Sequence, residues 1–193
     1  MTAFVEGEIT FTFAQGLTVC KYDDSKFYRG TMLRVEGTKG VDFLVVRPGS
    51  GNMSNTVFIE VKDLTGHESR NRQRLLSGRL VSEVVQKVRD TLSGLYAAQR
   101  WDIQELRPFV RALFHNPASA RILVILFLEE RKSSSLLFPY KRRLADQVQL
   151  LNSKLRPFRA EGRIYNSRTL PSSLGWKGVR RAGQTDGAFA KRK

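Results

Sequence analysis

The sequence is poor in residues that form covalent cross-links or bind soft metals. Its 193 residues include one cysteine, Cys20, and two histidines, His67 and His115. A single cysteine excludes a disulfide within the chain, which favours a reducing compartment. With so few Cys and His side chains, a zinc site of the Cys/His type is not expected.

Long apolar segments are also missing. The longest apolar run, Ile122–Leu128, is far shorter than the ~20 residues that a membrane-spanning helix needs. The N-terminal residues show no basic start followed by an apolar stretch, so no signal peptide is predicted. We therefore expect a cytoplasmic protein that does not enter a membrane.

Acidic residues are few compared with basic ones. Eighteen Asp and Glu stand against 33 Lys and Arg, which leaves a formal net charge of +15 and a pI near 10.5. Such a field attracts polyanions, so nucleic acid is the expected partner, with DNA favoured. Residues 141–193 hold 14 basic and 3 acidic residues, which favours a nucleic-acid grip or a tethering tail. An acidic partner subunit, a membrane surface and a homodimer remain alternatives.

Two strand-like segments lie on either side of a cluster of turn-forming residues. Val41–Val46 and Val57–Lys62 are rich in β-branched and aromatic residues, and Arg47–Asn52 between them contains Pro, Gly, Ser and Asn. This pattern predicts an antiparallel hairpin. Upstream, Glu8–Phe13 alternates like a strand, whereas Leu17–Tyr22 is compatible with a strand or the start of a helix.

Apolar residues at helical spacing follow the hairpin. They predict one helix from about Arg79 to Arg100 and a second from near Pro139 to before Pro157, because proline suits a first turn and limits the residue before it. Between these helices, Ile122–Leu128 is predicted to be a buried strand. Arg163–Tyr165 is a candidate for a last edge strand.

These elements predict an α/β fold in which helices pack on one mixed β-sheet. The length suffices for a single domain, which we place at residues 1–168. From about Thr169 the chain is rich in Gly, Ser, Lys and Arg, so residues 169–193 are predicted to be a basic, mobile tail. Trp176 in that tail is a candidate for docking on a partner.

Two carboxylates and a lysine are predicted to converge at one end of the hairpin. Asp42 lies on the first strand, and Glu60 and Lys62 lie on the second. Because residues i and i+2 of a strand point the same way, Glu60 and Lys62 share a face. An antiparallel hairpin of this length can place Asp42 opposite that pair.

Phosphodiester hydrolysis uses such a set of side chains. Carboxylate oxygens such as those of Asp42 and Glu60 bind hard cations, here Mg²⁺ or Mn²⁺. The metal screens the phosphate charge and lowers the pKa of a bound water. A neighbouring lysine such as Lys62 can orient that water and stabilise charge that develops on the phosphoryl oxygens.

The segments Gly40–Phe43 and Phe58–Lys62 resemble the split motif of the PD-(D/E)XK phosphodiesterase superfamily. The resemblance extends over roughly Gly37 to Tyr165 and implies a restriction-endonuclease-like core, a mixed β-sheet flanked by α-helices. It implies that Asp42 and Glu60 bind the metal and that Lys62 assists the attacking water. Val41 stands where the family name has proline.

Many family members add an acidic residue from an N-terminal helix. Asp24, Asp23 and Glu8 are the candidates here, with Asp24 preferred. Some exonuclease-like members carry Gln and Tyr one turn apart on the following helix. In this chain Gln86 is followed at that spacing by Asp90, so the sub-motif is missing.

Other residues allow two interpretations. Arg70, Arg72 and Arg74, directly after the motif, either grip phosphates of the scissile strand or belong to a solvated loop. Tyr96 and Trp101, at the end of the first predicted helix, are expected in the core or at its edge rather than stacked on bases.

Three functional hypotheses result. The first is a Mg²⁺- or Mn²⁺-dependent deoxyribonuclease, with an endonuclease of restriction, repair or anti-phage defence favoured. The second is a basic nucleic-acid-binding module of the same fold without catalysis. The third is a basic interaction subunit of a larger complex. Asp42, Glu60 and Lys62 together favour the first, since a binding module has no need of all three.

Overall fold

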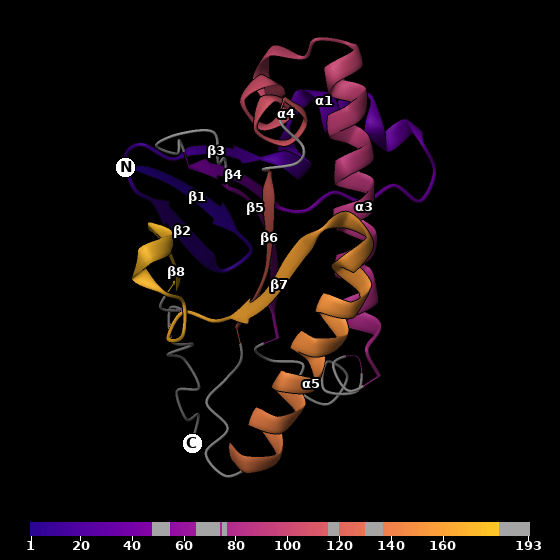
Figure 1. Cartoon of the computed structure of the whole chain (residues 1–193). Coiled ribbons are helices and arrows are strands. Elements are labelled where there is room, and N and C mark those ends of the chain that lie inside the picture. Colours follow the sequence, from indigo (N-terminus) through magenta and orange to yellow (C-terminus); the bar gives the residue numbers. More distant parts are fainter. Residues whose placement is uncertain (48–54, 65–73, 75–76, 116–119, 130–136, 182–193) are drawn as a thin grey trace, which may run out of the picture.

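A computed structural model shows two β-sheets and a layer of helices in the described part of the chain (Figure 1). The structure describes residues 1–47, 55–64, 74, 77–115, 120–129 and 137–181, with side chains for all of these except residues 55 and 137–143. The strands and longer helices are β1 (Thr2–Glu6), β2 (Ile9–Phe13), β3 (Thr18–Lys21), α1 (Lys26–Gly30), β4 (Phe43–Arg47), β5 (Asn55–Asp63), α3 (Arg79–Arg100), α4 (Arg107–Phe114), β6 (Arg121–Glu129), α5 (Leu137–Leu155), β7 (Ala160–Tyr165) and β8 (Trp176–Arg180). Short 3₁₀ turns occupy Tyr22–Asp24, Met32–Arg34, Gln104–Leu106, Arg156–Phe158 and Ser172–Leu174. None of the described helices is long and apolar enough to cross a bilayer.

The larger sheet has five strands in the order β3-β4-β5-β6-β7. β3, β4 and β5 are antiparallel neighbours, whereas β5, β6 and β7 run parallel. The predicted α/β class, the antiparallel pairing of the two hairpin strands and the edge position of the last strand are therefore confirmed. The open choice for Leu17–Tyr22 is resolved as a strand, β3. The predicted turn at Arg47–Asn52 lies outside the described residues from position 48 onward.

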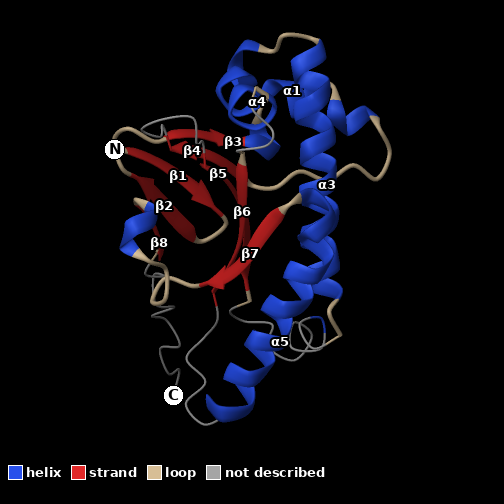
Figure 2. Cartoon of the chain, in the orientation of Figure 1, coloured by secondary structure: helices blue, strands red, loops and turns tan. Residues whose placement is uncertain are grey.

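Helices cover one face of this sheet, and the smaller sheet covers the other (Figure 2). Strands β5 and β6 are buried on both faces, which explains their almost continuous apolar sequence. Phe58 and Leu126 point into the core shared with the helices, while Ile59 and Phe127 point into the core between the sheets. Glu60, two residues after Phe58, therefore lies on the helix-covered face.

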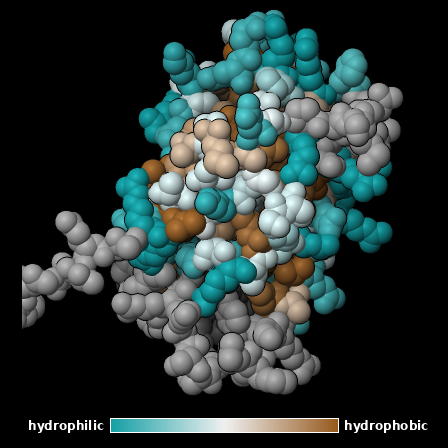
Figure 3. Space-filling view, turned by 90° about the vertical axis from the view of Figure 1, so that its left-hand side faces the viewer, coloured by the Kyte–Doolittle hydropathy of each residue, from teal (hydrophilic) through white to brown (hydrophobic). Residues whose placement is uncertain are grey.

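The prediction of a single mixed sheet is wrong. β1, β2 and β8 form a second, three-stranded antiparallel sheet in the order β1-β2-β8. Its partners come from the two ends of the chain, with Ile9 opposite Arg180 and Phe13 opposite Trp176. A pairing between such distant segments leaves no local pattern in the sequence. On the side of the small sheet, apolar and polar side chains are interspersed over the surface (Figure 3).

The prediction of a mobile tail from Thr169 is wrong for residues 169–181. β8 is an ordered strand, and the Trp176 side chain is 5% exposed and packs on Phe11, Phe13 and Phe127. Trp176 is thus a core residue and is not free to dock on a partner. Gly178 makes this packing possible, because a Cβ there would lie 2.7 Å from the Phe127 ring. Residues 182–193 lie outside the described part of the chain.

Both long predicted helices are present. α3 has the predicted limits, and α5 begins two residues before Pro139 and ends before Pro157. α4 was not predicted from the apolar spacing; Pro108 lies in its first turn, where no backbone donor is required. The expectation that Tyr96 and Trp101 lie in or beside the core is wrong, because their side chains are 54% and 75% exposed.

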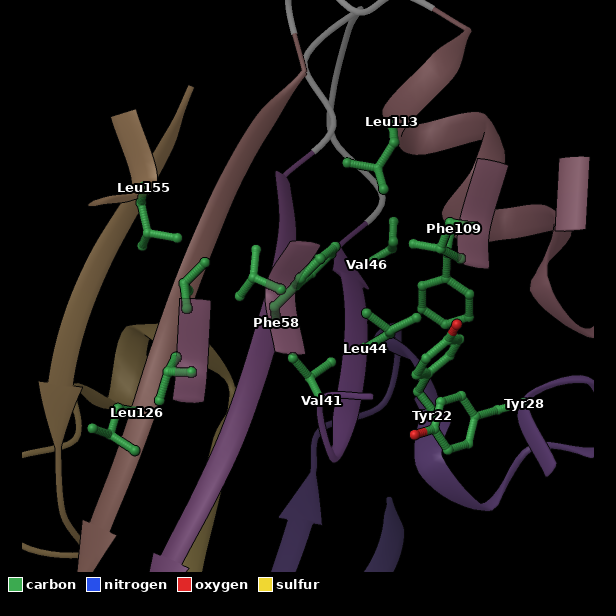
Figure 4. Packing of buried hydrophobic residues seen from close by; sticks show 14 of the residues in the cluster. Tyr22, Tyr28, Val41, Leu44, Val46, Phe58, Phe109, Leu113, Leu126 and Leu155 are labelled. Carbon is green, nitrogen blue, oxygen red and sulfur yellow. The ribbon is translucent and has the colours of Figure 1, made fainter. Parts of the chain in front are cut away.

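The core between the large sheet and the helices ends in a close contact between Tyr22 and α3. The Tyr22 and Tyr28 rings lie side by side, 5.2 Å apart, at one end of this core (Figure 4). Tyr22 is fully buried, and among the described residues its hydroxyl has no hydrogen-bond partner. A Cβ built at Gly94 of α3 would overlap this hydroxyl. Gly94 is therefore needed for space.

Gly94→Ala is expected to lower the free energy of unfolding by about 1–2 kcal/mol. The gain of up to ~1 kcal/mol in helix propensity is smaller than the 1–3 kcal/mol typical of overpacking. In a Tyr22→Phe background the hydroxyl is gone, so the penalty should shrink. Urea unfolding of the two single variants and the double variant measures both effects. Stabilisation by Gly94→Ala alone would contradict the proposed contact.

Candidate active site

The ends of β4 and β5 bring the predicted site residues together. Asp42 immediately precedes β4 rather than lying within it, and its backbone N–H donates to the Ile59 carbonyl over 3.1 Å. The register pairs Phe43 with Ile59, so Asp42 lies opposite Glu60. Glu60 and Lys62 share one face of β5, as the strand periodicity predicts.

Both carboxylates are almost completely buried. Asp42 is 5% exposed and Glu60 is 1% exposed. One Asp42 oxygen accepts a hydrogen bond from the Val61 backbone N–H over 2.5 Å. One Glu60 oxygen lies 2.6 Å from the Lys62 ammonium, whose side chain is 26% exposed. Lys62 thus reaches from solvent to the buried acid.

A second lysine, Lys87 on α3, joins the site and was not predicted. Its ammonium lies 2.7 Å from Glu60 Oε2 and 3.3 Å from Asp42 Oδ1. These two carboxylate oxygens are consequently no more than about 6 Å apart, within reach of one hydrated cation whose ligands lie at ~2 Å. The sequence contains only a weak indication that Lys87 belongs to the site. Lys87 directly precedes Val88, at the border of the apolar stripe of α3.

Three further side chains of α3 hold the segment that leads into Asp42. Thr91 accepts a hydrogen bond from the Val41 backbone N–H over 3.1 Å, and Asp90 accepts one from the Lys39 N–H over 3.1 Å. Gln86 donates to the Gly37 carbonyl over 3.2 Å. Gln86 and Asp90, weighed in the sequence as part of a catalytic sub-motif, thus fix the position of the strand relative to Lys87.

Burial and the neighbouring charge dominate the chemistry of Glu60. Burial, followed by repulsion from Asp42, raises the pKa of Glu60 to about 7 despite the attraction of Lys87 and Lys62. Burial alone would lower the pKa of Lys87, but Glu60 and Asp42 outweigh it and raise that pKa. At pH 8, above that pKa, Glu60 is therefore mostly ionised and pairs with Lys87 and Lys62.

Among the three acidic candidates for the N-terminal position, Asp23 is the one whose charge interacts with Asp42. Burial, followed by the charge of Asp42, raises the pKa of Asp23 to about 6. The preferred candidate, Asp24, instead pairs with Lys21 over 2.5 Å and with Arg29. Glu8 is exposed in the β1-β2 turn. The Asp24 carboxylate is thus already paired with two cations, so the structure favours Asp23 over Asp24 for this position; the acid that completes the site stays a prediction.

The site residues fit a hard cation in part. Within the described ranges, no group of three or more His, Cys, Asp or Glu side chains is arranged to hold a metal ion. Asp42 and Glu60 supply two oxygen ligands, which suffices for Mg²⁺ because this ion usually keeps several waters. The Lys87 ammonium lies between these oxygens, so the position between them already accommodates positive charge.

Several predicted phosphate contacts are not described. Arg70 and Arg72 lie outside the described residues, as do the basic side chains of residues 141–143 and the whole of residues 191–193. Arg74 is described, and its guanidinium pairs with Glu83 of α3 over 2.7 Å. Its interpretation as a phosphate contact stays a prediction.

The raised pKa values of Glu60 and Asp23 predict that stability falls with rising pH. Between their ordinary values near 4 and their values of about 7 and 6, the folded protein binds more protons than the unfolded chain. The free energy of unfolding should therefore decline from about pH 4 to 7, by on the order of 2–3 kcal/mol for Glu60. Glu60→Gln should remove most of this decline, whereas Glu161→Gln, at an exposed position, should not. Denaturant titrations at pH 5, 6, 7 and 8 measure the slope, and parallel slopes for wild type and Glu60→Gln would contradict the assignment.

The chain matches no protein-family model, no curated protein and no solved structure. Its function is therefore inferred from the residues and their geometry.

Proposed function

We propose that the protein is a Mg²⁺- or Mn²⁺-dependent nuclease of the PD-(D/E)XK type that hydrolyses DNA. The observation that carries this proposal is the convergence of buried Asp42 and Glu60 with a lysine, Lys62, at one end of a sheet. Burying two carboxylates side by side is costly unless a partner compensates them. Such a costly arrangement is typical of a functional site.

The arrangement of elements supports the same proposal. A mixed sheet carries the acidic pair on β4 and β5, α3 follows β5, and β6 returns parallel to β5. This order corresponds to the strand, strand, helix, strand, helix core of restriction-endonuclease-like proteins. The formal charge of +15 adds attraction for a polyanionic substrate.

Each side chain has a distinct task in this proposal. Asp42 and Glu60 would hold the metal, which when bound supplies Lewis-acid activation of water and screening of phosphate charge. Lys62 would orient the attacking water and stabilise negative charge on the phosphoryl oxygens. Lys87 favours the ionised form of Glu60 and would hold both carboxylates in place until a metal binds.

Cleavage assays test this function directly. Purified protein is incubated with plasmid, linear duplex, single-stranded and branched DNA, and with RNA, in Mg²⁺, in Mn²⁺ and in EDTA. We expect cleavage of DNA with either metal and none in EDTA. Cleavage of closed circular plasmid would identify an endonuclease. Intact substrates under every metal condition would overturn the proposal.

One observation favours the alternative of an inactive nucleic-acid-binding module or a basic subunit of a larger complex. Lys87 pairs with both carboxylates and Lys62 with Glu60, so the buried charges have cationic partners without a metal ion. In that case the basic surface binds DNA or an acidic partner without hydrolysis. Salt-dependent DNA binding without cleavage would favour this alternative.

A further inference from the structure

An open hollow of about 540 Å³ adjoins the carboxylates. Lys87 belongs to both, because it lines the hollow and its ammonium contacts Asp42 and Glu60. Asp23 also lines the hollow and is close enough to Asp42 for the two charges to interact. A ligand in this hollow would therefore lie next to any phosphodiester bound at the carboxylates.

The wall of the hollow combines positive charge with apolar surface. Arg29, Lys39 and Lys87 contribute cationic groups, and Leu33 contributes aliphatic surface. Tyr28 is 6% exposed and contributes only a small part of its side chain. Leu33 is 52% exposed and the Arg29 side chain is 64% exposed, so both are accessible to a ligand. Guanidinium and ammonium groups bind phosphate, and flat apolar surface receives a base or sugar.

Tyr28 forms a rigid part of this wall. Its hydroxyl accepts a hydrogen bond from the Gly40 backbone N–H over 2.8 Å and donates to the Thr38 carbonyl over 3.4 Å. A Cβ at Gly40 would lie 2.9 Å from the Tyr22 ring and 3.0 Å from the Tyr28 ring, so the segment before Asp42 packs closely on both rings. The wall is thus preformed.

We propose that this hollow binds one nucleotide of a nucleic-acid strand beside the scissile phosphodiester. Arg29 and Lys39 take the phosphate, and Leu33, backed by the largely buried Tyr28, receives the base or sugar. A volume of about 540 Å³ lies in the range of small-molecule sites. This inference rests on the proposed nuclease function and names the neighbouring contact of its substrate. The phosphate belongs either to the interior of a strand or to its 5′ end.

Binding measured without divalent metal tests the inference separately from cleavage. Fluorescence anisotropy in EDTA follows a 3′-labelled, eight-nucleotide DNA strand with the double variant Arg29→Gln/Lys39→Gln. The control Lys154→Gln/Lys177→Gln removes the same charge at two exposed positions outside the hollow. We expect the first pair to weaken binding about tenfold and the control pair less than about threefold. Equal weakening by both pairs would overturn the inference, because only general attraction would remain.

A second comparison tests the apolar wall. Leu33→Ala should weaken binding a few-fold. Val35 is 60% exposed but lies outside the hollow, so Val35→Ala should not weaken binding. Equal affinities for both variants would overturn the role of the wall.

A third comparison distinguishes the two sources of the phosphate. If a 5′-phosphorylated strand binds more tightly than its 5′-hydroxyl counterpart only while Arg29 and Lys39 are present, the hollow is a 5′-end subsite. If the two strands bind equally, it is an interior subsite. Selective binding without any cleavage would overturn the nuclease and leave the nucleotide subsite standing.

Discussion

Asp42→Asn and Glu60→Gln are each expected to reduce metal-dependent DNA cleavage by at least about 10²-fold, the loss typical when one group that stabilises a charged transition state is removed. Each substitution keeps the shape of the side chain and removes one anionic oxygen ligand. Metal affinity should fall, so part of the activity should return at high Mn²⁺ concentration. Initial rates over a series of Mn²⁺ concentrations measure both effects.

Replacement of Lys62 should affect cleavage differently from replacement of the two carboxylates. Lys62→Met should leave metal binding largely intact and damage the chemical step, so added Mn²⁺ should not restore activity. DNA binding should survive in all three variants, because none of these residues is needed for general attraction by the basic surface. Full activity of Lys62→Met would show that the proposed task of this lysine is wrong, even if the carboxylate variants behave as expected.

Lys87→Met is expected to have two opposite effects at pH 8. Without metal, it leaves two buried carboxylates with only Lys62 nearby, and the free energy of unfolding should fall by on the order of 2–4 kcal/mol. With metal, it removes a cation that competes for the position between Asp42 and Glu60. A unit charge about 4 Å away is worth roughly 4 kcal/mol at an effective dielectric constant of 20, and regaining about half of this would make Mn²⁺ bind about 10- to 100-fold more tightly.

Calorimetric titration with Mn²⁺ and denaturant unfolding with and without Mn²⁺ measure these effects of Lys87→Met. The loss of stability should be smaller at pH 6, because the raised pKa of Glu60 allows that carboxyl to take up a proton. Lys154→Met removes an exposed lysine on α5 and serves as a matched control. Unchanged Mn²⁺ affinity in Lys87→Met would contradict the competition between lysine and metal.

The sequence by itself determined the local structure around the site. The alternation of Phe58, Ile59 and Glu60 decided which faces of β5 they occupy, and the apolar spacing from Leu80 to Leu95 decided the extent of α3. Both properties follow from the geometry of one strand or one helix, so a short window of sequence contains them. The same holds for the pairing of Asp42 with Glu60, which depends on one hairpin.

Only the tertiary structure decided which distant residues lie beside Asp42 and Glu60. Lys87 reaches Asp42 across 45 positions of sequence, and this contact depends on how α3 lies over the sheet. The choice of Asp23 over Asp24 depends on the rotation of one short turn beside the site. Contacts of this kind have no periodicity in the sequence, because they are set by packing between elements.

Packing between distant elements also explains why the prediction of a mobile tail from Thr169 was wrong for residues 169–181. Its composition of Gly, Ser, Lys and Arg is typical of a mobile tail. Three of its features instead serve the second sheet: Trp176 fills the core between the sheets, Gly178 leaves room for Phe127, and Arg180 pairs with Ile9 at the other end of the chain. Composition reports the average of a segment, whereas a strand forms when an existing sheet edge supplies its hydrogen bonds and a core receives its one large apolar side chain.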